Sequence, residues 1–149
     1  MRIFIDADGC PVVDITVGEA VRHGISCVIV CDTSHEIQYE GAETVVVSQG
    51  RDSADLYIVN NISAGDLVIT QDYGVAAMSL GKGAFVLDQN GREYTSSNIG
   101  VLLELRAIHA EIRRSRGKLK SSKKKRSHAD DKHFEVSLRA ILERSIADA

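Results

Sequence analysis

Residues 3–11 read IFIDADGCP, a short apolar run that ends at two carboxylates placed two residues apart. In an open sheet of parallel strands, ligands bind at the carboxyl edge, which is where this run ends. Side chains two residues apart on a strand share a face, so Asp6 and Asp8 can converge on one cation. Hard divalent cations prefer such oxygen ligands. In the alternative interpretation, one aspartate caps the following helix and the other is solvated, because short motifs often match by chance.

Short apolar runs alternate with helical patterns along most of the chain. Runs that are apolar on both faces are typical of buried parallel strands. The alternation predicts an α/β fold with a mostly parallel central sheet of five strands, built as a single domain over residues 1–149. We expect strands at 3–5, 27–30, 44–47, 67–70 and 84–87, and helices at 14–23, 53–61, 74–80, 99–112 and about 129–146.

The charge of the chain is unevenly distributed. The net charge is −3, yet residues 113–126 carry nine Lys or Arg and no acid. This composition predicts a basic, low-complexity loop at 113–128 on an acidic body, an arrangement that attracts a polyanion to the loop. We expect Lys123, Lys124, Lys125 and Arg126 to contact the phosphate backbone of a nucleic acid without reading its sequence. The alternative is a solvated linker.

The composition also bears on where the protein works. No stretch approaches the roughly 18 uninterrupted apolar residues of a membrane span, so no membrane partner is expected. The N-terminal residues do not resemble a signal peptide. Cys10, Cys27 and Cys31 form an odd set without the spacing of a zinc site or a disulfide framework. These features favour a cytoplasmic protein.

Further aspartates lie at positions from which they could join Asp6 and Asp8 at one edge of the sheet. Asp52 and Asp55 lie at the start of the helix at 53–61, and Asp72 follows the strand at 67–70. If the strands are parallel neighbours, these acids meet Asp6 at one sheet edge and form a metal site. Helix capping explains Asp52 well, and Asp8 in part. It explains Asp6 and Asp72 poorly, which favours the metal site over simple capping.

Four segments in order, at residues 6–12, 52–55, 70–74 and 94–99, identify a resemblance to the YaiI/YqxD family of bacterial proteins. That family looks like a branch of the PIN/NYN nuclease-like superfamily. The resemblance covers almost the whole chain and implies a PIN-like, three-layer α/β/α fold. It also implies clustered acids that bind Mg²⁺ or Mn²⁺ for RNA cleavage. Asp6, Asp55 and Asp72 match the superfamily acids, Asp8 and Asp52 have no firm counterpart, and Asp88 matches loosely and is better explained as a turn residue.

Hydrolysis of a phosphodiester needs an activated water, a neutralised phosphate and support for the leaving oxygen, all of which carboxylate-bound cations can supply. The predicted catalytic group is Asp6, Asp8, Asp55 and Asp72. The predicted metal ligands are Asp6, Asp52, Asp55 and Asp72, with Asp8 or Asp52 orienting a water. Ser53 and Thr70 are candidates to bind phosphate oxygens, although capping and strand-edge hydrogen bonds explain them equally well.

Two other functions compete with a nuclease. A phosphatase of the haloacid dehalogenase type also begins with a strand and a DxDG motif; Asp6 would then be the nucleophile and Asp8 the acid and base. That mechanism needs a downstream lysine, which the matching segments lack. The second rival is a non-catalytic RNA-binding or interaction module in which the acids are structural. Cys10, beside the acids, is interpreted as a packing residue.

Overall fold

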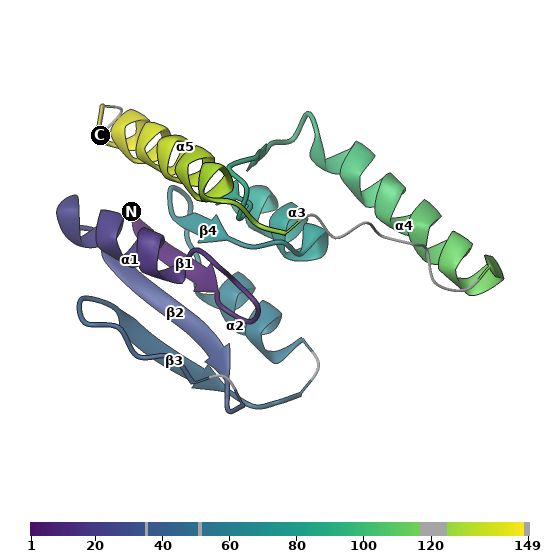
Figure 1. The fold of residues 1–149 in the computed structure, drawn as a ribbon, viewed down its shortest axis with the longest axis horizontal. Coiled ribbons are helices and arrows are strands. Elements are labelled where there is room, and N and C mark those ends of the chain that lie inside the picture. Colours follow the sequence, from purple (N-terminus) through teal and green to yellow (C-terminus); the bar gives the residue numbers. More distant parts are fainter. Residues whose placement is uncertain (35, 51, 117–124, 148–149) are drawn as a thin grey trace.

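The computed structural model describes residues 1–34, 36–50, 52–116 and 125–147. Six strands form one sheet in the order β3-β2-β1-β4-β5-β6, and Figure 1 labels the first four of this order. All neighbouring pairs are parallel except β5 and β6, which are antiparallel. The strands are β1 (Arg2–Asp6), β2 (Ser26–Asp32), β3 (Glu43–Val47), β4 (Leu67–Ile69), β5 (Phe85–Leu87) and β6 (Glu93–Tyr94).

Helices cover both faces of this sheet, so the predicted three-layer α/β/α fold is confirmed. The alternating side chains of β1 divide the core, because Ile3 and Ile5 point to one face and Phe4 to the other. The first face packs against α1 and α5, and the second against α2, α3 and the start of α4. The helices are α1 (Val13–Arg22), α2 (Ser53–Asn61), α3 (Tyr73–Gly81), α4 (Ile99–Arg116) and α5 (His128–Ala147).

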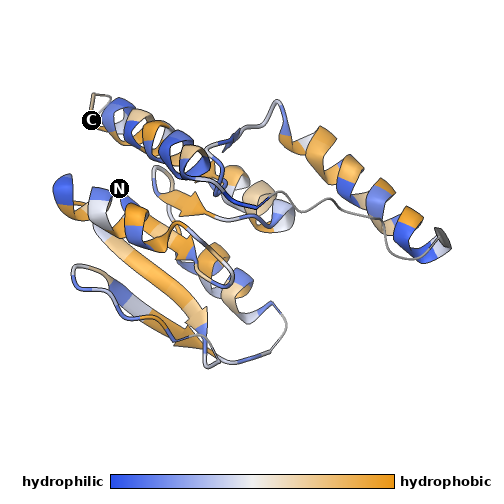
Figure 2. Ribbon diagram, viewed as in Figure 1, coloured by the Kyte–Doolittle hydropathy of each residue, from blue (hydrophilic) through white to orange (hydrophobic). Residues whose placement is uncertain are grey.

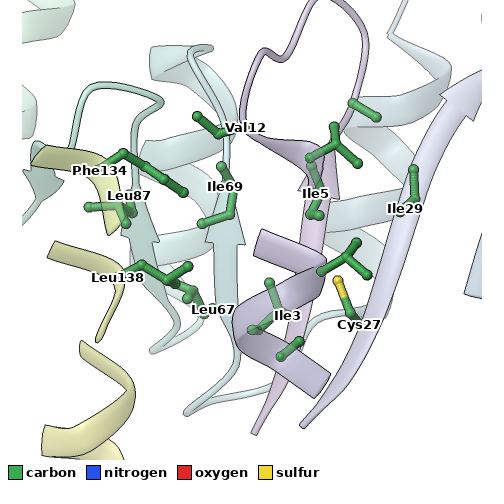
Figure 3. Packing of buried hydrophobic residues seen from close by; sticks show 14 of the residues in the cluster. Ile3, Ile5, Val12, Cys27, Ile29, Leu67, Ile69, Leu87, Phe134 and Leu138 are labelled. Atoms are coloured by element: carbon green, nitrogen blue, oxygen red, sulfur yellow. The ribbon is translucent and has the colours of Figure 1, made fainter. Parts of the chain in front are cut away.

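The C-terminal helix α5 is held to the body by apolar packing and by one buried ion pair. Figure 3 shows its side chains Phe134 and Leu138 in the cluster formed with the strands. Arg139 donates from Nε and Nη2 to Oε1 of Glu19 on α1, at 3.0 and 2.9 Å. Burial alone would raise the pKa of Glu19, but Arg139, with help from Arg22 and His23, lowers it below its ordinary value. Glu19 is therefore a charged side chain that joins α1 to α5.

The chain order places a topological switch at β1. From β1 the chain proceeds outward to β2 and β3, then crosses back to β4 on the other side of β1. At such a switch the loops after the two central strands part in opposite directions and leave a crevice at their carboxyl ends. The crevice lies between the segment after Asp6 and the segment after Ile69, where the sequence places its acidic motifs.

Two expectations are corrected. The sheet has a sixth strand, β6, which is only two residues long and leaves no periodic signal in the sequence. The basic stretch does not begin as a loop, because residues 113–116 continue α4. Arginine is a good helix former, which is consistent with this extension. Residues 125–127 have no regular structure and α5 begins at His128. Among the described helices, none is long and apolar enough to cross a membrane.

Candidate acidic site at the sheet edge

A hollow of about 340 Å³ lies at the carboxyl edge of β1, β2 and β3 and reaches the start of α2. Its polar lining is dominated by carboxylates, which come from strand ends and from the first turn of a helix. Ser48 and Ser53 add hydroxyl groups, and their Oγ atoms lie 3.0 Å apart. The aspartates that line it are Asp6, Asp8, Asp32, Asp52 and Asp55.

Thr70 fixes the position of Asp6. Its hydroxyl donates to Oδ2 of Asp6 at 2.9 Å and accepts from the backbone N–H of Asp72 at 3.0 Å. The residue is only 2% exposed, so its hydroxyl lies behind Asp6 and is not open to a substrate. Thr70 therefore positions Asp6 and links the ends of β1 and β4, while its role in binding phosphate oxygens stays a prediction.

The structure reverses the capping roles expected for Asp52 and Asp72. Oδ1 of Asp72 accepts from the backbone N–H groups of Gly74 and Val75, at 2.8 and 3.1 Å, so Asp72 caps α3. Asp52 precedes α2 but makes no capping hydrogen bond with its side chain. A capping side chain requires an extended backbone at its own residue, which Asp72 has. Asp52 instead has a left-handed backbone, with φ of 65°.

The carboxylates at this edge influence one another's ionisation. Burial is the main cause that raises the pKa of Asp6 from its ordinary 3.8 to about 6, and the hydrogen bond from Thr70 opposes it. The charges of Asp55, Asp72 and Asp8 raise it further. The pKa of Asp55 is also raised, first by burial and then by Asp72 and Asp52, while Arg106 lowers it. The four acids predicted as a catalytic group thus lie within one electrostatic neighbourhood.

This neighbourhood is not a closed metal cage. Within the described part of the chain, no three Asp, Glu, His or Cys side chains are arranged to hold a metal ion. Asp72 uses Oδ1 for its cap, and Nη1 of Arg106 lies 3.8 Å from the same oxygen. Mg²⁺ in proteins keeps several waters and is often bound through only one or two direct carboxylates, so a closed cage is not a requirement for it. Asp6 and Asp55 both line the hollow, and neither carboxylate caps a helix.

Two charged residues at this edge were not anticipated. Asp32 ends β2 and lines the hollow, while its Oδ1 accepts from N and Oγ of Ser34 at 2.9 and 2.6 Å. It follows a buried apolar strand as Asp6 does, so the same sequence rule could have found it. Arg106 lines a neighbouring hollow of about 310 Å³ with Asp55 and Asp72. It projects from an exposed helix, and no local pattern distinguishes it from other surface arginines.

Arg126 is docked on the body and does not belong to a free arm. Its Nε pairs with Asp131 at 2.7 Å. Its Nη1 and Nη2 donate to Oδ1 of Asn90 and to the carbonyl oxygen of Gln89, at 2.9 and 2.8 Å. These contacts give Arg126 a structural role, and its contact with phosphate stays a prediction. Lys125 is exposed, whereas Lys123 and Lys124 lie outside the described residues.

The remaining candidates have structural explanations. Oδ1 of Asp88 accepts from the backbone N–H groups of Asn90 and Arg92, each at 2.8 Å, so Asp88 stabilises the turn between β5 and β6, as interpreted from the sequence. Cys10 is half-buried against the core. Burial, with smaller contributions from Asp6 and Asp14, raises the pKa of its thiol. A thiol of raised pKa is a poor nucleophile, which fits a packing role.

Comparison with known proteins places the chain in a family. Residues 4–144 match the family described as "Uncharacterized BCR, YaiI/YqxD family". A UPF0178 protein of Exiguobacterium sibiricum is 46% identical over 142 residues, which is 95% of this chain and 96% of the relative. A UPF0178 protein of Clostridium acetobutylicum is 39% identical over 145 residues, 97% of this chain and 98% of the relative. No solved structure matches the chain. With its acidic sheet edge and a match over nearly its whole length, the chain belongs to the YaiI/YqxD family.

Proposed function

We propose that this protein is a divalent-metal-dependent phosphodiesterase that cleaves RNA. The observation that carries the proposal is the gathering of Asp6, Asp8, Asp55 and Asp72 at the switch point of the sheet, beside a hollow of about 340 Å³. Open α/β sheets bind ligands at this place. The sequence resemblance to PIN/NYN nucleases, in which Asp6, Asp55 and Asp72 match the superfamily acids, adds independent support.

In this proposal the aspartates have different roles in binding the cation and orienting a water. Asp6 and Asp55 hold Mg²⁺ or Mn²⁺ directly, and Asp52 and Asp72 complete the site through bound waters. A cation held there would supply charge to neutralise the phosphate and would lower the pKa of a bound water. Asp8 is exposed at the rim, where its carboxylate can orient that water toward phosphorus. Because the pKa of Asp6 is about 6, cation binding competes with a proton at Asp6 and is weaker at acidic pH.

The phosphatase alternative receives less support. Its mechanism needs a lysine beside the nucleophile, and among the described residues no lysine lines either hollow that Asp6 borders. The hydrogen bond from Thr70 also occupies Oδ2 of Asp6, one of the two oxygens that could attack phosphorus. A metal-dependent mechanism needs no lysine beside Asp6. It is also compatible with the hydrogen bond from Thr70, because ligand carboxylates are commonly held by a second hydrogen bond.

Replacing Asp55 by Asn is expected to remove RNA cleavage and metal binding together. We expect the wild-type protein to cleave single-stranded RNA with Mn²⁺ or Mg²⁺, and Asp55→Asn to lower the rate by roughly a hundredfold or more, since a lost ligand weakens the bound cation. The measurements are cleavage of a labelled oligonucleotide and the thermal shift produced by Mn²⁺. The matched control is Glu43→Gln, which removes one exposed carboxylate at the opposite end of β3.

Three outcomes would contradict the proposal: a wild-type protein with no Mn²⁺ shift and no cleavage, cleavage that survives Asp55→Asn, or turnover of phosphate monoesters alone. The first would favour the non-catalytic module, and the last would favour the phosphatase.

The basic segment is expected to supply binding and not chemistry. Replacing Lys123, Lys124 and Lys125 by Ser should weaken RNA binding in every sequence context. It should also lower the slope of log K against log salt by roughly 0.7 to 0.9 per lost phosphate contact. Cleavage of a short saturating substrate should change little. Arg126 is left in place because its pairing with Asp131 is structural. An unchanged salt slope would show that this segment is a solvated linker.

A further inference from the structure

Helix α4 extends away from the rest of the molecule, as Figure 1 shows. Its first turns are seated on the body, where Leu102 is buried in the second core cluster and the helix packs mainly against α3. One turn later, Arg106 still lies 3.8 Å from Asp72. Most residues between that point and Ser115 are exposed.

The exposed part of α4 carries an apolar seam. Val101, Leu105 and Ile108 are 60%, 43% and 44% exposed, and Ile112 follows at the next position of the series. The steps of four, three and four residues are the spacing of a coiled-coil seam. Figure 2 shows hydrophobic and hydrophilic bands alternating along α4. A single exposed apolar residue needs no explanation, but a regular stripe of three, continued by the half-buried Ile112, marks a contact surface.

This seam faces away from the body. With 3.6 residues per turn, the side of the helix that carries Leu102 and Arg106 is centred roughly 110° around the axis from the side that carries Leu105 and Ile108. The first pair contacts the core and Asp72, so the second pair faces solvent. Val101, Leu105 and Ile108 stay exposed, and Ile112 is half-buried. A helix of 18 residues is only marginally stable in water by itself, and most helices in proteins depend on packing of an apolar face.

We propose that α4 pairs in parallel with α4 of a second copy of this chain, giving a two-fold symmetric dimer through the seam of Val101, Leu105, Ile108 and Ile112. A symmetric interface uses the same surface twice and therefore requires a self-complementary surface, which an apolar seam provides. Beside Val101 lies a shallow hollow of about 420 Å³, lined by Arg92, Ser97, Asn98 and Leu102, that extends the contact surface toward the body.

The charges beside the seam fix the direction of pairing. Glu104 and Glu111 lie on one flank, and His109 and Arg113 lie toward the other. A parallel pair places each acidic flank against the basic flank of the partner, whereas an antiparallel pair places like flanks together. The second arrangement would repel at both edges. The charges do not favour a different protein as the partner, because the acidic flank repels an acidic surface and the basic flank repels a basic one.

The dimer is expected to be weak. Four seam residues make an interface at the low end of the range for protein pairs, so we expect a Kd in the range of roughly 1–100 µM. Sedimentation equilibrium over that range should show a monomer–dimer equilibrium without metal or RNA. Ile108→Glu should raise Kd by roughly a hundredfold, because it places a charge at the centre of the seam. Leu105→Glu should do the same.

The matched control is Val136→Glu on α5, since Val136 is 59% exposed and lies off the seam. It should leave Kd unchanged, and circular dichroism should show that all variants stay folded. A wild-type protein that is monomeric at about 1 mM, or an Ile108→Glu variant that dimerises like wild type, would overturn the proposal. Neither result bears on RNA cleavage, because the inference does not use the acidic site.

A separate experiment tests whether the two α4 helices pair in parallel. In a Cys10→Ser background, Val101→Cys should form a disulfide-linked dimer when oxidised with diamide, because a parallel pair places the two copies of position 101 side by side. In an antiparallel pair position 101 lies opposite position 112, so its two copies are about 16 Å apart along the axis. Cys27 and Cys31 are buried and should not react. A dimer that resists this cross-link would overturn the parallel arrangement.

Discussion

Phe134→Ala is expected to lower the free energy of unfolding by about 3–5 kcal/mol, which is the usual cost of removing a buried phenyl ring. Phe134 is fully buried where α5 covers the sheet, in the same cluster as Leu87 and Val12 (Figure 3). Alanine would leave a cavity that the neighbouring strand cannot fill, because β5 is held in the sheet between β4 and β6. Urea unfolding followed by circular dichroism measures the change.

The control for this prediction is on the same helix. Val136 is 59% exposed, so Val136→Ala should change stability by no more than about 0.5 kcal/mol. If the two variants were equally stable, α5 would not be packed on the sheet as described, and the first face of the core would be incomplete.

Asp6→Asn is expected to make the metal-free protein more stable at pH 7.5, by roughly 1–3 kcal/mol. The pKa of Asp6 is about 6 in the folded protein and 3.8 ordinarily. Between these values the folded state holds a proton that the unfolded state has lost. The wild type therefore loses stability as pH rises from about 4 to about 6, while the variant, which cannot ionise at this position, does not. Asparagine can still accept the hydrogen bond from Thr70 through its amide oxygen.

Unfolding experiments at several pH values give the sign directly. The two proteins should be equally stable near pH 3.5 and diverge through the window that the two pKa values define. Mn²⁺ should then stabilise the wild type at pH 7.5 and leave the variant unchanged, because a bound ligand stabilises only the state that binds it. A variant that is less stable than wild type at pH 7.5 would mean that Asp6 is a structural carboxylate. The candidate site would then lose its central member.

Much of the fold could be predicted because its signals are local. The strands β1, β2 and β4 are short apolar runs such as Ile3 to Ile5, and burial on both faces requires such runs in a covered parallel sheet. Strand β6 could not be predicted, because two residues show no period. The end of α4 was also missed, since the basic composition after Ile112 was interpreted as a loop, although arginine favours helix.

The candidate site was predicted to the level of its sheet edge but not of its roles. Parallel strands end at one edge, so the neighbourhood of Asp6, Asp55 and Asp72 followed from topology alone. The exchange of roles between Asp52 and Asp72 depends on a backbone angle, φ of 65° at Asp52, that residue type does not determine. Thr70 could not be separated from a substrate-binding residue, because only its burial behind Asp6 distinguishes the two. The docking of Arg126 depends on contacts 36 and 37 residues away.

The position of α5 has a consequence for how the chain folds during its synthesis. One face of the sheet is closed by α1 together with Phe134, Leu138, Ile141 and Leu142, which a ribosome adds only after all six strands. Until then the nascent sheet has a partly bare apolar face, and Glu19 lacks the arginine that compensates its buried charge. Exposed apolar surface makes such intermediates prone to aggregate. The sheet therefore cannot be covered on this face before Leu142 has emerged, and α5 closes the structure only once its apolar residues are available.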